Sequence, residues 1–238
     1  MTISHQLNED GILLIGLNRP EKLNALDEAS KILLGEVWEY ARNENKVKSI
    51  VIYGEGERAF CAGSDLKETQ EKGRTVTTDI LARSLPGVHQ PLNKPVIAAL
   101  HGFTLGLGIS LAIHCDYRIA HPDTRFSFPE IHHGMLSGFS AITLPLLIGE
   151  SRAMDLMLSG REFSAQQSLD WGLVNELSEQ PRDAAISLAG KLSTDKVAKA
   201  AGWTKRLILS ERRRQISRYL EDIDQARSLV TRQSAPRD

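Results

Sequence analysis

The chain has 238 residues, of which 41% are hydrophobic and 25% charged, and this is enough to bury one substantial core. Its 29 basic and 30 acidic side chains give a net charge of −1, so no excess of charge indicates a nucleic-acid-binding or membrane-bound protein. The first residues, MTISHQLNEDG, contain no basic region followed by an apolar run, so we predict neither a signal peptide nor a membrane anchor.

Strands and helices are expected to alternate along the chain. Apolar runs predict strands at residues 11–17, 48–53, 96–100 and 117–120, and helical periodicity predicts helices at 27–42 and 107–114. Further on we expect a helix from Ser164, a short strand at 172–177, and three helices at 183–192, 196–211 and 215–230. Because strand, turn and helix repeat, the pattern predicts an α/β fold with βαβ crossovers.

Two cysteines, Cys61 and Cys115, lie in segments that we expect to be buried. Their spacing fits neither a disulfide framework nor a zinc site. The simplest account is a reduced, intracellular setting, and we therefore expect a cytoplasmic protein.

Two glycine-rich turns follow predicted strands. The segment GFTLGLG, with glycines at 102, 106 and 108, allows the backbone to turn tightly into a helix that starts near Leu107. Earlier, the segment GEGERAFCAGSDL changes direction at Gly63 and presents the N–H of Ser64 before Asp65 and Leu66 begin the next element. Two such amides aimed at one point would form an oxyanion hole, whereas either turn alone could simply be a sharp loop.

Five sequence blocks, in this order, resemble the enoyl-CoA hydratase/isomerase (crotonase) family. They are NRPEKLNAL at 18–26, FCAGSDLKE at 60–68, KPVIAALHGFTLGLG at 94–108, FPEIHHG at 128–134 and SAQQSLDWGLVNEL at 164–177. The resemblance implies a crotonase-like ββα spiral fold for residues 1–177. It also implies a C-terminal helical region at 178–238, shortened at its end, that builds a homotrimer or hexamer.

The resemblance also implies an acyl-CoA thioester substrate and an oxyanion hole made by the backbone amides of Ser64 and Leu107. No metal or redox cofactor is implied, since coenzyme A is part of the substrate, and no nucleic-acid or membrane partner is expected. The other substrate-binding positions that it implies are Lys22, Ala25, Leu26, Ala62, Asp65, Leu66, Lys67, Gly108 and Ser110. Lys22 and Lys67 are candidate phosphate contacts, although an exposed lysine is usually just a surface residue.

The acid–base positions depart from those of a hydratase. Hydratases that the chain resembles carry two glutamates, but the first position is Ser110 here and only the second is retained, as Glu130. Water addition uses one group to activate water and one to manage the proton, so a single carboxylate favours enoyl-CoA double-bond isomerisation. Without the resemblance, Glu130 would read as a helix-start acid and Ser110 as a serine bonded to the main chain.

Three alternatives stay open. The chain could be a hydratase, or another lyase or hydrolase of the family, in which Ser110, His132 or His133 replaces the missing carboxylate. The two histidines could equally be a partly exposed pair that flanks a turn. The chain could also be a catalytically weak module that binds acyl-CoA or RNA, or a structural paralogue without turnover.

Overall fold

The computed structural model describes the backbone of residues 1–233 and the side chains of residues 1–230. Its main sheet has six strands in the order β1-β2-β3-β5-β7-β10. These strands are β1 (Ile3–Leu7), β2 (Ile12–Leu17), β3 (Ser49–Gly54), β5 (Val96–Leu100), β7 (Tyr117–Ala120) and β10 (Glu176–Leu177). Only β1 runs antiparallel to its neighbour, and the central parallel strands are buried runs of valine, isoleucine, leucine and alanine.

A second, smaller sheet has the order β4-β6-β8-β9. Its strands are β4 (Ala59–Cys61), β6 (Phe103–Leu105), β8 (Arg125–Ser127) and β9 (Phe163–Ser164). Each of β3, β5 and β7 in the main sheet leads directly into a strand of the second sheet, and a helix follows. This repeated strand, strand and helix unit is the ββα spiral that the family resemblance implied.

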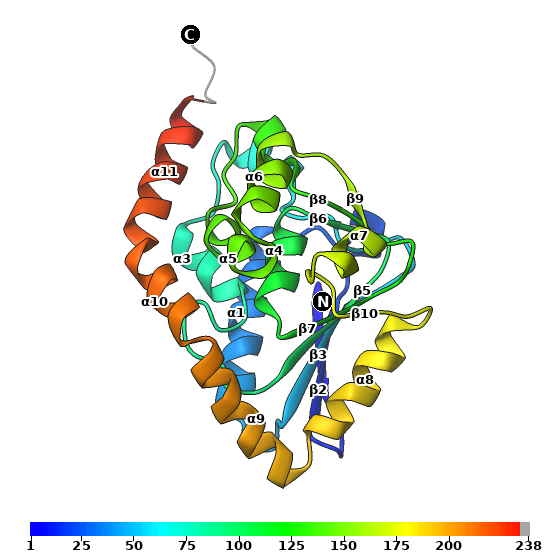
Figure 1. Cartoon of the computed structure of the whole chain (residues 1–238). Coiled ribbons are helices and arrows are strands. Elements are labelled where there is room, and N and C mark those ends of the chain that lie inside the picture. Colours follow the sequence, from blue (N-terminus) through cyan, green and yellow to red (C-terminus); the bar gives the residue numbers. More distant parts are fainter. Residues whose placement is uncertain (234–238) are drawn as a thin grey trace.

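Helices surround the two sheets (Figure 1). They are α1 (Glu28–Asn43), α2 (Leu66–Lys72), α3 (Thr78–Ser84), α4 (Leu107–His114), α5 (Gly138–Ile148), α6 (Glu150–Ser159), α7 (Ala165–Asp170), α8 (Pro181–Leu192), α9 (Asp195–Ile208), α10 (Ser210–Arg218) and α11 (Leu220–Gln233), with 3-10 helices η1 (Pro20–Lys22) and η2 (Pro129–His133).

Helix α8 closes one face of the main sheet. Ala185 and Ala189 of α8 are fully buried in a cluster with Val51, Ile97 and Ile119 of the sheet. The small alanine side chains let the helix lie close to the strands. Helix α8 therefore completes the core, although it falls within the predicted C-terminal helical region.

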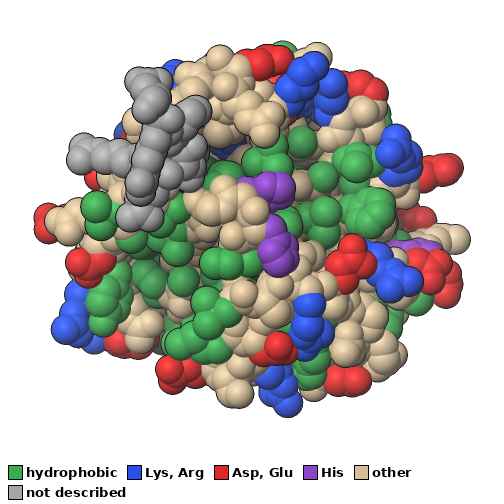
Figure 2. Space-filling model, turned by 90° about the horizontal axis from the view of Figure 1, so that it is seen from above, with side chains coloured by type: hydrophobic (Ala, Val, Ile, Leu, Met, Phe, Trp, Pro, Cys, Tyr) green, Lys and Arg blue, Asp and Glu red, His purple; other side chains and the backbone are tan. Residues whose placement is uncertain are grey.

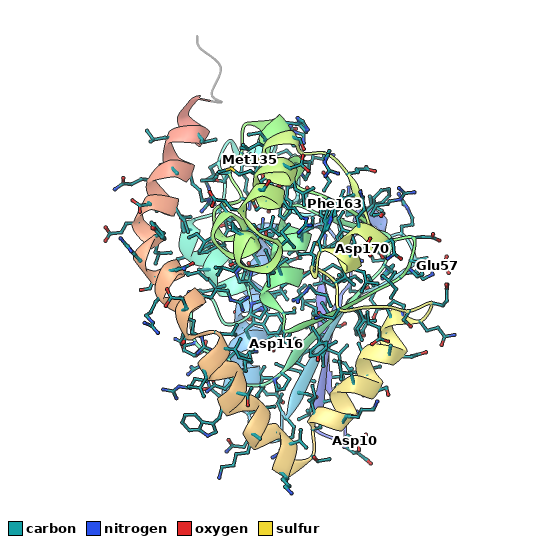
Figure 3. All side chains as sticks on the ribbon, viewed as in Figure 1. Asp10, Glu57, Asp116, Met135, Phe163 and Asp170 are labelled. Carbon is teal, nitrogen blue, oxygen red and sulfur yellow. The ribbon has the colours of Figure 1, made fainter. Side chains whose placement is uncertain are left out.

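Helices α9, α10 and α11 form an arm along one side of the molecule (Figure 1). The ammonium of Lys205 on α9 lies 2.6 Å from Oδ2 of Asp116, which follows α4 and is labelled in Figure 3. The same ammonium donates a hydrogen bond of 2.8 Å to the carbonyl of Lys94. These contacts anchor the start of the arm to the ends of the central strands.

The sequence placed three elements incorrectly. The strand expected at 172–177 is only Glu176–Leu177, because Gly172 has a φ of +77° and makes a turn. The structure has three helices where two were expected, at 196–211 and 215–230. The backbone leaves helical geometry at Leu209 and again at Tyr219. The last five residues of the predicted helical region, 234–238, lie outside the described residues.

Candidate active site

The two glycine turns pack backbone against backbone. Gly63 has a φ of +101°, and a Cβ there would lie 3.1 Å from the carbonyl oxygen of Leu105 and 3.4 Å from the amide nitrogen of Leu107. A Cβ on Gly108 would lie 2.3 Å from the carbonyl oxygen of Cys61, which is closer than real contacts allow. Glycine at both positions is thus what lets the two turns meet.

Both predicted oxyanion amides face the same space. Ser64 and Leu107 line one cavity, and neither backbone N–H donates a hydrogen bond to any residue in the described part of the chain. Leu107 is also the first residue of α4, where backbone N–H groups have no partner within the helix and favour negative charge. The arrangement offers two amide donors to a group bound in the cavity.

Asn24 and Arg19 hold the first turn in place. The buried Asn24 has a φ of +55°, and its Nδ2 donates hydrogen bonds to the carbonyls of Glu55 and Ala59, at 2.9 and 2.8 Å. Arg19 forms an ion pair of 3.0 Å with Asp65. Sequence analysis singled out neither Asn24 nor Arg19, although both lie in the NRPEKLNAL block.

The loops at residues 22–26 and 62–67 lie side by side. The N–H of Leu26 donates to the carbonyl of Gly63 at 2.8 Å, and the N–H of Asp65 donates to the carbonyl of Leu26 at 3.0 Å. The N–H of Ala62 likewise donates to the carbonyl of Leu23 at 2.9 Å. The two loops that carry most of the predicted substrate-binding positions are therefore held together by backbone hydrogen bonds.

The other predicted contacts on these loops are more exposed. Lys22 ends η1 and is exposed, and Lys67 is exposed on α2, with its ammonium 4.0 Å from a carboxylate oxygen of Glu71. Ala25 and Leu66 are half-buried, and the carbonyl of Ala25 accepts a hydrogen bond from the Arg19 guanidinium. Binding roles for these residues stay predictions.

Glu130 lies against the second turn. It sits in the first turn of η2 after Pro129, and a Cβ on Gly106 would lie 3.0 Å from its Oε1. Its Oε2 is buried and forms no hydrogen bond within the described chain. Burial raises the pKa of Glu130, while hydrogen bonds from its own backbone N–H and from Ser137 act in the other direction. A carboxylate held in this way is able to accept a proton from a group in the cavity.

Ser110 lies in a cluster of serine hydroxyls. Ser110 on α4 is 3% exposed, and its hydroxyl lies 2.6 Å from the hydroxyl of Ser140 and 3.3 Å from that of Ser137. It also donates to the carbonyl of Gly106 at 3.3 Å, which is the backbone bond expected of a helix serine. Among the described residues that line the cavity, Glu130 alone carries a carboxylate.

His132 and His133 lie outside this cavity. Both are exposed on η2, and neither is among the residues that line the cavity. A Cβ on Gly160 would lie 2.5 Å from Nε2 of His132, so this ring packs on the turn that follows α6. The structure therefore does not bring either histidine into the cavity beside Glu130.

The cavity has two parts. We call the part made by Ser64, Leu107, Ser110, Glu130 and Ser137 the turn wall. We call the part made by side chains from α1, α3, α11 and the loop between α2 and α3 the helix wall, which comprises Lys31, Thr75, Val76, Leu81, Leu85, Arg227 and Val230. Thr69, Met135, Leu136, Gly138 and Phe139 complete the lining, and Met135 is labelled in Figure 3. The empty volume is about 740 Å³, including open solvent at its mouth.

Sequence analysis singled out no residue of the helix wall, and Lys31 is its most buried charged residue. Its side chain is 2% exposed, and burial lowers the pKa of its ammonium to about 8, although nearby acidic groups act in the other direction. The only signal in the sequence was a polar residue at a core-facing position of α1. Without the fold, this signal does not show which part of the molecule the side chain faces.

The described residues contain no group of three or more histidine, cysteine, aspartate or glutamate side chains arranged to hold a metal ion. No helix within residues 1–233 is long and apolar enough to cross a membrane. Cys61 and Cys115 are both buried with free thiols, and burial raises the pKa of each to about 12.

Comparison with known proteins gives a consistent result. A family model described as enoyl-CoA hydratase/isomerase matches residues 8–231. The (E)-benzylidenesuccinyl-CoA hydratase of Thauera aromatica is 32% identical over 192 residues, which are 80% of this chain and 74% of the relative. The 2,3-dehydroadipyl-CoA hydratase of Escherichia coli is 37% identical over 185 residues, or 76% and 72% of the two chains. The structure of Pseudomonas aeruginosa OdaA has a TM-score of 0.85 at 26% identity and covers 97% of this chain and 94% of that one. The chain therefore belongs to the enoyl-CoA hydratase/isomerase, or crotonase, family.

Proposed function

We propose that this enzyme adds water to the double bond of an enoyl-CoA thioester, or removes water in the reverse direction, through an enolate. The observation that carries the proposal is the buried Oε2 of Glu130, which lies beside a cavity lined by Ser64 and Leu107. Within the described residues, neither this oxygen nor the amides of Ser64 and Leu107 have a hydrogen-bond partner. The two curated relatives named above are acyl-CoA hydratases, which supports water as the second reactant.

In the proposed reaction, ionised Glu130 takes a proton from water while the water oxygen bonds to C3 of the acyl chain. The electron pair of the double bond then moves toward the thioester oxygen, where the amides of Ser64 and Leu107 hold the negative charge. The same carboxyl group returns its proton to C2, so one H and one OH have been added and Glu130 is ionised again. Because burial raises the pKa of Glu130, its carboxylate is a stronger base than an ordinary carboxylate, which favours removal of the proton from water.

A second candidate is double-bond isomerisation, which was the leading expectation from the sequence. Ser110 favours it, because the cavity then contains one carboxylate where a hydratase of the family has two. In that reaction Glu130 would remove a proton from C2 of a 3-enoyl-CoA and return it to C4, with the same enolate held by the same amides. We place it second because of the names of the relatives.

One experiment distinguishes these two reactions. The protein is incubated separately with 2-enoyl-CoA and 3-enoyl-CoA of several chain lengths, and the products are followed by mass spectrometry and by ultraviolet absorbance. Hydration adds the mass of one water, whereas isomerisation conserves mass and changes the absorbance. If neither class of substrate is converted at any length, the proposed function is wrong.

Assembly into a homotrimer or hexamer stays a prediction. Four apolar side chains from η2, α5 and α6 are exposed, namely Ile131, Leu146, Met154 and Leu158. On the face seen in Figure 2, apolar side chains gather in the middle and charged ones lie mainly toward the edge. On α9, Trp203, Leu207 and Ile208 are also exposed, by 57%, 71% and 73%. Light scattering coupled to size exclusion would give the oligomeric mass.

A further inference from the structure

We propose that Lys31 binds a carboxylate on the acyl group, so that the enzyme prefers acyl-CoA substrates whose acyl chain carries an anionic group. The inference rests on the proposed acyl-CoA function and extends it to the class of acyl group. Three features of Lys31 carry it: its place in the cavity, its lack of a partner, and its position in the helix.

Lys31 projects from the first turn of α1 into the cavity that contains Glu130 and Ser64. Lys31 is only 2% exposed. Its ammonium nitrogen nevertheless does not belong to the fully enclosed polar atoms that lack a hydrogen-bond partner. Because Lys31 lines the cavity and its nitrogen is not fully enclosed by protein, we infer that the ammonium faces this space. A ligand that fills the cavity will displace the water that solvates this charge.

The ammonium of Lys31 has no hydrogen bond or ion pair with any residue in the described part of the chain. The acidic side chains around it already have other partners. Asp27 and Asp65 both pair with Arg19, at 3.3 and 3.0 Å, and Glu68 pairs with Lys72 at 2.8 Å. A buried charge without a partner is costly, so a carboxylate supplied by the ligand would be strongly favoured.

Fold stability does not account for a lysine at this position. It lies in the first turn of α1, where the helix dipole disfavours a positive charge. Methionine or leucine would fill the same space without burying a charge. The helix wall also carries Arg227, which hydrogen-bonds to the hydroxyl of Thr78 and the carbonyl of Val76, so it adds positive charge to the same side of the cavity.

The anion could in principle come from coenzyme A or from the acyl group, and matched ligands separate these two sources. Saturated acyl-CoA thioesters that end in a carboxylate, such as succinyl-, glutaryl- and adipyl-CoA, are compared with butyryl-, valeryl- and hexanoyl-CoA. Both series carry the same coenzyme A. None has the double bond that the proposed reaction needs, so binding measured by calorimetry is independent of turnover.

The unmodified protein is expected to bind at least one carboxylate-ended thioester about 10- to 100-fold more tightly than its methyl-ended partner, the range of one charged hydrogen bond. Lys31→Met should abolish this preference by weakening the first series and leaving the second within a few fold. Lys31→Arg keeps the charge and should keep part of the preference. Lys46→Met, which changes an exposed lysine outside the cavity, is the matched control.

Three results would overturn the inference. The first is equal affinity for the two series at every length, or no binding of either. The second is a preference that survives in Lys31→Met, which would show that another residue binds the acyl carboxylate. The third is an equal loss of turnover with charged and uncharged enoyl-CoA in Lys31→Met, which would make Lys31 an acid–base group. Lys31→Met should retain or raise the melting temperature at pH 7, so misfolding is easily recognised.

Failure of the proposed reaction would look different. If no enoyl-CoA were hydrated or isomerised but the preference for carboxylate-ended thioesters depended on Lys31, the reaction would be wrong and the binding inference would stand. If turnover were found but no preference for carboxylate-ended thioesters existed, the proposed reaction would stand and the binding inference would be wrong.

Discussion

The two walls of the cavity are built in different ways. The turn wall presents backbone amides and one carboxylate. Its geometry depends on glycines at 63 and 108 that bring two turns into contact, and on Gly106, which leaves room for the carboxyl group of Glu130. The helix wall consists of side chains from α1, α3 and α11, which are far apart in the chain. We therefore propose that the turn wall sets the reaction and that the helix wall selects the acyl group.

The largest effect expected on the turn wall is that of Glu130→Gln, which keeps the shape of the side chain and removes the base. Turnover should fall by about 100- to 10,000-fold, the usual contribution of general acid–base catalysis. Binding of a saturated acyl-CoA should change by no more than a few fold. Steady-state kinetics and calorimetry provide the two readouts, with Glu36→Gln on the exposed face of α1 as the control. Turnover at the parent rate would remove Glu130 from the mechanism.

The same substitution tests the raised pKa. Burial raises the pKa of Glu130 in the folded state above its pKa in the unfolded chain. Such a carboxyl group does not change the stability of the fold at pH values below its pKa in the unfolded chain. It destabilises the fold as the pH rises from there through its pKa in the folded state. Glu130→Gln should therefore gain stability relative to the parent as pH increases from about 4. As the pH is lowered, turnover of the parent should fall because Glu130 becomes protonated. The midpoint of this fall should lie at a pH above the ordinary pKa of glutamate. Melting curves across pH 4 to 8 check the direction of the stability change, and rates over the same range check the direction of the change in turnover.

The second largest effect is expected for Leu107→Pro. Proline lacks the N–H but is well tolerated at the first position of a helix, so the change removes one oxyanion donor with little cost to α4. Turnover should fall by about 100- to 1,000-fold, equivalent to about 2.7 to 4 kcal/mol. Leu107→Ala keeps the N–H and is the control, and circular dichroism checks the fold. A folded proline variant that turns over normally would exclude this amide as a donor.

A smaller effect distinguishes the helix wall from the turn wall. The pKa of Lys31 is lowered to about 8, so its positive charge is lost as pH rises through this value. Affinity for a carboxylate-ended thioester should then fall by up to about tenfold for each pH unit above about 8, and level off above the pKa of Lys31 in the complex, whereas affinity for its methyl-ended partner should stay constant. The ionisable groups around Lys31 are Asp27, Cys61, Asp65 and Glu68. Calorimetry from pH 7 to 10 measures both slopes, and parallel slopes would argue against a role for Lys31.

The smallest effect is expected for Ser110→Ala. If the serine cluster orients the attacking water, hydration should slow by about two- to tenfold, the value of one neutral hydrogen bond, while any isomerisation should continue. The ratio of hydrated to isomerised product, measured by mass spectrometry, is the readout. An equal loss in both reactions would indicate that Ser110 supports the structure of α4 and has no role with water.

The sequence alone determined most of the turn wall. The blocks around Gly63 and Gly106 predict tight turns because glycine is needed there, and η2 begins at Pro129, which places Glu130 in its first turn. Helix α4 begins at Leu107, as predicted. These features are local, since they depend on the backbone preferences of a few adjacent residues.

Only the tertiary structure decided the helix wall. Residues 69–90 show no clear periodicity, yet they contain most of α2 and the whole of α3, which packs against α1. Tyr219 interrupts a predicted helix where the arm bends between α10 and α11. Lys31 reads in the sequence as an ordinary lysine on an amphipathic helix. Its burial, and the absence of a partner, arise because α1, α3 and α11 meet around it, and contacts between distant segments are not encoded in any local pattern.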